Sequence, residues 1–355
     1  MAYGFDERSA FQEFLQSQFS REHWPFLEDS SAPARRRSPA LAEYESAFSS
    51  CTICPPQPRP GAFGRHRLIL HAYSGRRRRG DFQEFFEACA LRCPGLVLHV
   101  VSVDVVLSSC WGDVTKRETQ QFWYKGIADR YVVGYLAGPP CETRSKAREV
   151  QNENTGGRPA PRMVRSLPEL WGLSALTIRE LRQVSIGNEL LLFSLMCLVL
   201  LSGQDGCGAL EHPAEPVSAH SESIWRTELV RLLTRLPGFN LVTFAQGLLG
   251  AKSAKPTTLL TLNLPTMARH IHAHRLCAGL PVASSIGRDS TGSWQTMALK
   301  EYPPSLCHAL AACFIARVSE YELDTDLVVD DEFWAKCKAM VADLDSQYVG
   351  PDFAT

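Results

Sequence analysis

From residue 66 onward the chain alternates short apolar runs with stretches whose apolar residues recur at helical spacing. Helical spacing is clearest in 81–93, "DFQEFFEACALRC", and in 177–203, which reads as one or two helices ending at Gly203. The apolar runs predict buried strands at 66–75, 96–106, 131–141, 208–216, 239–246 and 257–264, the last two as a pair. Strands alternating with helices predict an α/β fold, a doubly wound and mostly parallel sheet covered on both faces.

The longest apolar run is Leu190–Leu201, "LLLFSLMCLVLL". Its twelve residues are too few to cross a bilayer and suit a buried helix, so no transmembrane segment and no membrane partner are expected. No internal repeat is evident.

Two flanking regions differ from this pattern. Residues 1–65 are rich in Pro, Ser and Arg, as in "SSAPARRRSPA", and predict a loosely ordered arm with one helical patch. Residues 321–355 are acidic and predict a helical tail. The interval 66–320 is therefore expected to hold the catalytic or binding domain.

Composition narrows the function classes. A formal net charge of −1 over 355 residues argues against a wholly basic nucleic-acid coat but permits a local basic face. The twelve cysteines have no regular spacing and no signal peptide precedes them, which predicts reduced thiols in a nuclear or cytoplasmic protein that is not secreted.

Residues with useful chemistry fall where the predicted strands end. Ligands collect at the carboxyl ends of strands in an open parallel sheet. The candidates there are Ser74-Gly75, Asp104, Asp113, Pro140-Cys141 and Glu211. Gly75 lets backbone approach a ligand closely, and Asp104 suits ribose hydroxyls, although a surface aspartate is the alternative. The four arginines Arg76–Arg79 could hold a carboxylate or phosphate, or could form a solvated loop.

Cys141 is the sharpest single signal, in "LAGPPCETRSKAR" (136–148). Two prolines restrict the turn before it, and the basic residues Arg144, Lys146 and Arg148 are expected to lower the pKa of the thiol. The alternative is a buried structural cysteine. Glu211 could supply a proton-donating carboxyl, or could be a salt-bridged surface carboxylate.

Together these residues resemble the catalytic domain of DNA cytosine-5 methyltransferases, over roughly 66–320. The family's Gly-Pro-Pro-Cys is matched fully by 138–141, and its Glu-Asn-Val strand end partly by Glu211 in "LEHP". Its first turn is matched loosely by "HAYSG", its two acidic cofactor residues by Asp104 and by "GDV" at Asp113, and its closing motif by "LKEYPPSLCHALA" (299–311).

The resemblance implies a Rossmann-like core that binds S-adenosylmethionine. The residues it assigns to the cofactor are Tyr73, Ser74, Gly75, Asp104, Asp113, Pro140 and Tyr302. It also implies that a cytosine is flipped out of the duplex, that Cys141 attacks C6 while Glu211 engages N3, and that C5 takes the methyl group.

The resemblance further implies nucleic acid as partner, DNA rather than RNA. The segment 142–165 has six Lys or Arg against three Glu and suits a mobile basic loop with Arg144, Lys146 and Arg148 as contacts, or else a disordered linker. The family's Gln-x-Arg-x-Arg strand is absent, and 246–262 offers Lys255 and Thr257 in a shortened form.

Other departures leave a second hypothesis open. Arginines replace the glycine-rich cofactor turn, and only about 35 residues separate the last strand from the closing motif, too few for a sizeable target-recognition domain. The alternative is a catalytically inactive methyltransferase-like module that binds nucleic acid or another partner, derived from a mobile element. A third is a methyltransferase for another substrate.

No metal site is expected. Cys51 and Cys54 have a ligand-like spacing without a second pair, and a zinc site there is disfavoured. His270, His272 and His274 would share one face if this segment were a strand, but a surface loop or a DNA-backbone contact is favoured over a metal.

Overall fold

The structure is a computed structural model that describes residues 66–90, 97–108, 112–144, 148, 161–216, 221–276, 279 and 300–319. All of these belong to one compact unit of the chain, Ile53–Thr355. The expected arm (1–65), the expected tail (321–355), the Cys51 and Cys54 pair and Lys146 lie outside the described residues.

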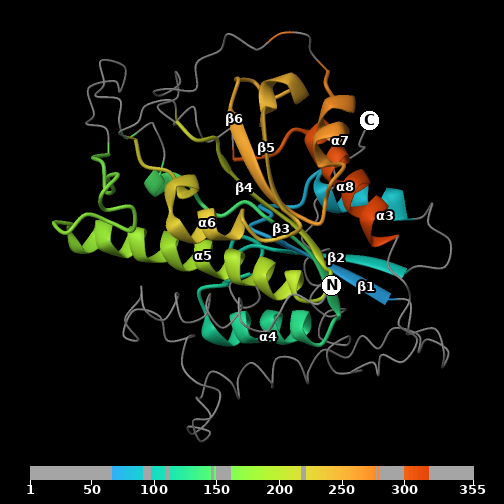
Figure 1. Cartoon of the computed structure of the whole chain (residues 1–355), viewed down its shortest axis with the longest axis horizontal. Coiled ribbons are helices and arrows are strands. Elements are labelled where there is room, and N and C mark those ends of the chain that lie inside the picture. Colours follow the sequence, from blue (N-terminus) through green and yellow to red (C-terminus); the bar gives the residue numbers. More distant parts are fainter. Residues whose placement is uncertain are drawn as a thin grey trace, which may run out of the picture. The chain divides into compact units, whose positions relative to one another are not determined.

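One mixed sheet of six strands organises the described part of the chain (Figure 1). The strands are β1 (His66–Ala72), β2 (Val97–Val103), β3 (Val132–Ala137), β4 (Cys207–Pro213), β5 (Phe239–Ala245) and β6 (Pro256–Leu262), in the spatial order β2-β1-β3-β4-β6-β5. The first four are parallel, whereas β6 runs antiparallel to both of its neighbours. The α/β class is confirmed, and the sheet is parallel only over β1 to β4.

The antiparallel pairing of β5 with β6 follows from a short connection. Only the turn η6 (Gln246–Leu249) and a few residues separate β5 from β6, and such a connection joins neighbouring strands only in an antiparallel pair. The predicted pairing of these two segments is therefore confirmed. Their placement, with β6 between β4 and β5, brings the start of β6 beside the end of β4, where Thr257 opposes Pro213.

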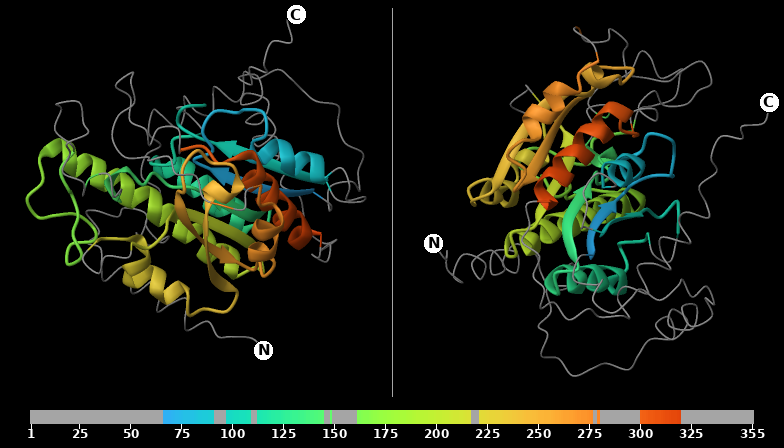
Figure 2. Two further views of the ribbon diagram at one scale, coloured as in Figure 1. Left: turned by 90° about the horizontal axis from the view of Figure 1, so that it is seen from above. Right: turned by 90° about the vertical axis from the view of Figure 1, so that its right-hand side faces the viewer.

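Helices cover both faces of the sheet (Figures 1 and 2). On one face α4 (Arg117–Ala128) and α5 (Ile178–Ser202) pack on each other and on β3, and α5 also packs on β4. On the other face α3 (Phe82–Ala90), α7 (Met267–Ala273) and α8 (Pro304–Val318) pack together, with α8 against β3 and β4. The short α6 (Glu228–Leu233) lies in the connection from β4 to β5.

The long helix α5 begins with a capping box. Thr177 accepts a hydrogen bond from the Glu180 amide at 3.3 Å, and the Thr177 amide donates to the Glu180 carboxylate at 2.9 Å. Among the described helices, α5 alone is long and apolar enough to cross a bilayer, and 61% of its most apolar window is buried inside the fold. Packing of this kind is also typical of a core helix.

The histidine segment is helical. His270 and His274 lie on the same side of α7, where the His274 ring nitrogen Nδ1 is 2.7 Å from the His270 carbonyl oxygen, and the His274 ring meets His308 edge-on. A strand carrying all three histidines on one face is therefore wrong, because a helix turns about 100° per residue. No cluster of three metal-ligating side chains occurs in the parts of the chain that the structure describes.

The first prediction tests the packing of α5 on the sheet. A Cβ at Gly208 would overlap Leu198 Cδ2 and lie 3.1 Å from the carbonyl oxygen of Tyr135, which strand pairing holds in place. Gly208→Ala should lower the free energy of unfolding by about 1–3 kcal/mol in urea denaturation. The control is Gly279→Ala, whose Cβ would enter open space and should change stability by less than about 0.5 kcal/mol. Equal stability of the two variants would contradict this packing.

Candidate active site at the ends of β1, β3 and β4

The turn after β1 is held by Asp104. The Gly75 amide donates to Asp104 Oδ2 at 2.9 Å, and the Val106 amide donates to Asp104 Oδ1 at 2.9 Å. Gly75 has φ +70° and Tyr73 has φ +58°, so the turn uses the left-handed region twice. A Cβ on Gly75 would meet no atom within 4 Å, so the space beside this backbone is open.

The arginine run after this turn is partly structural. Arg77 Nε lies 2.7 Å from Asp81 Oδ2, where Asp81 also accepts a hydrogen bond from the Glu84 amide at the start of α3. Arg78 Nη2 donates to the Tyr302 carbonyl oxygen at 2.5 Å, and Arg78 Nε lies 3.3 Å from Glu301. Arg76 and Arg79 are exposed. Burial alone would raise the pKa of Asp81, but the hydrogen bonds from Arg77 and the backbone lower it.

The turn after β3 begins at a glycine that the packing requires. A Cβ on Gly138 would lie 2.5 Å from Tyr302 Oη and 3.5 Å from Glu211 Oε2. The space above this Cα is thus filled by a tyrosine hydroxyl and a carboxylate from two other elements. Pro140 is exposed and Cys141 is half-buried immediately after it.

Glu211 is the centre of a polar cluster. Its Oε1 accepts a hydrogen bond from Gln246 Nε2 at 3.2 Å and lies 3.6 Å from Lys255 Nζ. Gln246 Nε2 also donates to Thr257 Oγ1 at 3.0 Å, and Lys255 Nζ lies 5.6 Å from the centre of the Tyr302 ring. Because a carboxylate only accepts, the amide nitrogen of Gln246 must face it.

The Cys141 thiol belongs to the same cluster. Burial, and after it the negative charges of Glu211 and Glu142, raise the pKa of Cys141 to about 12, and Lys255 opposes this shift. Cys141 is therefore a protonated thiol near neutral pH. The expected lowering of its pKa by basic neighbours is wrong for this arrangement.

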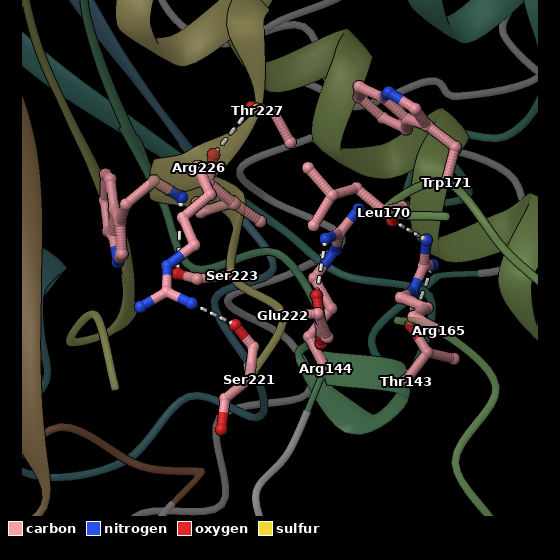
Figure 3. A network of polar contacts seen from close by, with 12 residues as sticks. Thr143, Arg144, Arg165, Leu170, Trp171, Ser221, Glu222, Ser223, Arg226 and Thr227 are labelled. Carbon is pink, nitrogen blue, oxygen red and sulfur yellow. Dashed lines mark hydrogen bonds and ion pairs between the residues drawn. The ribbon is translucent and has the colours of Figure 1, made fainter. Parts of the chain in front are cut away.

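The pKa of Cys141 is not lowered because Arg144 and Arg148 make other contacts. Arg144 Nη1 donates to Glu222 Oε2 at 2.9 Å, and the two side chains are 3% and 5% exposed (Figure 3). The Arg144 guanidinium also lies 5.6 Å from the centre of the Trp171 ring. Arg148 donates to the backbone carbonyl oxygens of Glu142 and Arg162. Arg144 is thus inside the fold, and its predicted contact with nucleic acid is corrected.

A second buried arginine, Arg165, contacts the turn that follows Cys141. Arg165 Nη2 donates to Thr143 Oγ1 at 3.0 Å, and its Nη1 donates to the Leu170 carbonyl oxygen (Figure 3). Arg165 Nη1 also donates to Asn188 Oδ1 at 2.8 Å. Burial, and then the charge of Arg144, lower the pKa of Arg165 to about 9. Arg144 and Arg165 both lie near the Glu222 carboxylate.

The residues expected to contact the cofactor have local roles. Asp113 Oδ1 accepts from the Thr115 amide at 3.2 Å and from the Thr115 hydroxyl at 2.6 Å, in the turn before α4. Tyr73 Oη donates to the Leu190 carbonyl oxygen at 2.8 Å. Tyr302 lies against Gly138 and Glu211, on the side of the proposed nucleophile.

Glu189 is a carboxylate that the sequence analysis missed. It is half-buried on α5 and accepts a hydrogen bond from Gln120 Nε2 at 3.3 Å. Burial, and the nearby charge of Asp113, raise its pKa. The signal in the sequence was the polar pair Asn188-Glu189 inside an apolar helix.

Two further residues expected at nucleic acid are internal. Thr257 is fully buried and donates to the Lys255 carbonyl oxygen at 3.1 Å. Lys255 has a side chain 16% exposed that faces Glu211. The predicted nucleic-acid role of Thr257 is therefore corrected by its burial, and Lys255 belongs to the cluster around Glu211.

The next prediction tests the ion pair behind Cys141. Glu222→Gln leaves the buried Arg144 without its charged partner, so the free energy of unfolding should fall by about 3–5 kcal/mol in chemical denaturation. Lys300→Met is the control, because the ion pair between Lys300 and Glu142 is half-exposed. That change should cost about 0–1 kcal/mol. A Glu222→Gln protein as stable as the control would show that Arg144 is not buried in this pair.

Comparison with protein-family models, with curated proteins and with solved structures finds no match for this chain. What the site does has to be argued from its own residues and geometry.

Proposed function

We propose that the protein is an S-adenosylmethionine-dependent methyltransferase of the cytosine-5 type, acting on DNA through a covalent cysteine adduct. One observation carries the proposal. Cys141 and Glu211, from neighbouring parallel strands, share a charged cluster over Gly138, where the chain turns out of β3. A thiol and a carboxyl so placed can act on one heterocycle from two sides.

The sheet topology offers a place for a cofactor beside this cluster. The first four strands fit a doubly wound, Rossmann-like core, with β2 and β3 on opposite sides of β1. In such sheets a ligand binds where the strand order reverses, at the carboxyl ends. Here that place is between the turns after β1 and β3, adjoining Cys141.

The residues at this place fit S-adenosylmethionine. The backbone beside Gly75 is open, and the Asp104 carboxylate keeps accepting capacity beyond its two backbone hydrogen bonds, as ribose hydroxyls require. Val105 and Val106 follow it with 57% and 53% exposure, an apolar surface suited to adenine. When bound, the cofactor supplies an electrophilic methyl group on sulfonium.

The chain's own residues would bind and activate the base. Gln246 and Lys255 hold Glu211 Oε1, which leaves Oε2 to carry a proton to N3 of cytosine. Protonation at N3 draws electrons from C6, and the Cys141 sulfur can then form its bond there, making C5 nucleophilic. Thiols without a disulfide bond at Cys141, Cys197, Cys207, Cys307 and Cys313 suit a nuclear or cytoplasmic location.

A second candidate is an inactive methyltransferase-like module that binds nucleic acid or another partner. The observation that favours it is the protonated state of Cys141, whose pKa is raised to about 12 by burial and by the charges of Glu211 and Glu142. In such a module the Arg144 and Glu222 pair would serve stability alone.

The third prediction separates the two candidates. Wild-type protein incubated with S-adenosylmethionine and duplex DNA containing 5-fluorocytosine should form a covalent adduct that survives denaturing electrophoresis, because fluorine blocks the release step. Cys141→Ser should form none while still binding the cofactor in calorimetry. A matched 5-fluorocytosine RNA tests the choice of nucleic acid.

Two outcomes would contradict the proposal. Absence of cofactor binding by the wild-type protein removes every methyltransferase function. Cofactor binding with no adduct on DNA or RNA favours the inactive module or another substrate.

A further inference from the structure

The Tyr302 hydroxyl is a buried polar group that the folded chain leaves without a well-formed hydrogen bond. Buried hydroxyls are normally paired, so such a group in a native fold calls for an explanation. Its position is well defined, since a Cβ on Gly138 would lie 2.5 Å from Tyr302 Oη and 3.5 Å from Glu211 Oε2. The hydroxyl and the second carboxylate oxygen therefore lie over the same backbone atom.

The rest of Tyr302 is held in place. Arg78 binds its carbonyl oxygen, helix α8 begins two residues later at Pro304, and Lys255 Nζ lies 5.6 Å from the ring centre. None of these contacts uses the hydroxyl. The Tyr302 residue is thus held by contacts that do not involve its hydroxyl, and the hydroxyl itself interacts with the Glu211 carboxylate.

The proposed reaction gives the Tyr302 hydroxyl a role. It requires Cys141 as a thiolate and Glu211 as a neutral acid, the reverse of a protonated thiol beside a charged carboxylate. Moving one proton from Cys141 to Glu211 creates both reactive forms at once. A hydroxyl can assist, because it accepts one proton while donating another.

We propose that Tyr302 relays this proton, an inference that rests on the proposed function for its chemistry. The Cys141 S–H proton passes to Tyr302 Oη as the Tyr302 O–H proton passes to Glu211 Oε2. The products are a thiolate, a neutral phenol and a neutral carboxylic acid, and nothing is oxidised or reduced. The Glu211 proton then goes to N3 of the base while the sulfur bonds to C6.

The charges around the pair make a concerted transfer necessary. Cys141 faces Glu211, Glu142 and Lys255, and Tyr302 faces Glu211, Cys307 and Cys141. Burial first, and the surrounding negative charge second, raise the pKa values of both the thiol and the phenol. Neither group forms a standing anion near neutral pH, so the two proton transfers must occur together, and the thiolate that they produce must react at once.

The test uses alkylation of Cys141 by iodoacetamide in the full-length protein, without cofactor or nucleic acid. The rate is followed from pH 6 to 10 by mass spectrometry of the Cys141 peptide, with the half-buried Cys89 as internal reference. In the wild-type protein a relay to Glu211 predicts a rate independent of pH between about 6 and 8, and a hydroxide-driven rise of about tenfold per pH unit above it.

Tyr302→Phe removes only the hydroxyl and keeps the ring and the backbone acceptor for Arg78. It should lower the pH-independent rate at least about tenfold and leave the high-pH rise unchanged. Glu211→Gln should also lower the pH-independent rate, because it removes the final acceptor, but it should raise the high-pH rate, because it removes a negative charge that raises the pKa of the Cys141 thiol. A thermal melt shows whether each variant is folded, and Glu211→Gln tests the relay even if Tyr302→Phe is not.

Two results would overturn the relay. A Tyr302→Phe profile equal to the wild-type profile means that the hydroxyl carries no proton. An equal fall at every pH means that the hydroxyl only shapes access to the thiol. The proposed function fails separately, since a relay seen in alkylation together with no 5-fluorocytosine adduct would keep the proton path and exclude cytosine methylation.

Discussion

The hydrogen bond from the Arg78 guanidinium to the Tyr302 carbonyl oxygen, 2.5 Å long, joins the turn after β1 to the segment before α8. Through it the Tyr302 side chain reaches across to Gly138 at the end of β3 and to Glu211 on β4. The parallel strands β1, β3 and β4 end at one edge of the sheet. Tyr302 lies close to a residue at the end of each one, namely Arg78, Gly138 and Glu211. The turn after β1 and the turn that carries Cys141 are therefore linked through Tyr302.

A second set of constraints lies behind the nucleophile. Arg144 and Arg165 are buried with one carboxylate, Glu222, and otherwise rely on neutral oxygens and on Trp171. Buried charges are costly, so such a network is weak evidence for stability by itself. Its effect is geometric, because Thr143 and Arg144 directly follow the Cys141 turn and are held on both sides. The turn can thus present the thiol in one direction.

The pattern of apolar residues in the sequence predicted much of this architecture. The four parallel strands are continuous apolar runs, as strands buried on both faces must be, and their ends placed Asp104, Cys141 and Glu211 near one edge. The segment with His270, His272 and His274 was expected as a surface loop, with a strand as the alternative, but it is helical, and histidines spaced two apart give no helical signal. Glu189 was missed because an apolar helix hides a single inward carboxyl.

By itself, the sequence determined the α/β class, the positions of the strands and the tight turn that carries Cys141, because these depend on local periodicity and on residues that restrict the backbone. Only the tertiary structure decided which charged and polar groups contact one another. Arg78 contacts Tyr302, which is 224 residues away in the sequence. Arg144 pairs with Glu222 at a separation of 78 residues, and Glu211 with Gln246 at a separation of 35. Electrostatic partners depend on distance in space and on burial, and neither quantity is contained in the spacing of residues along the chain.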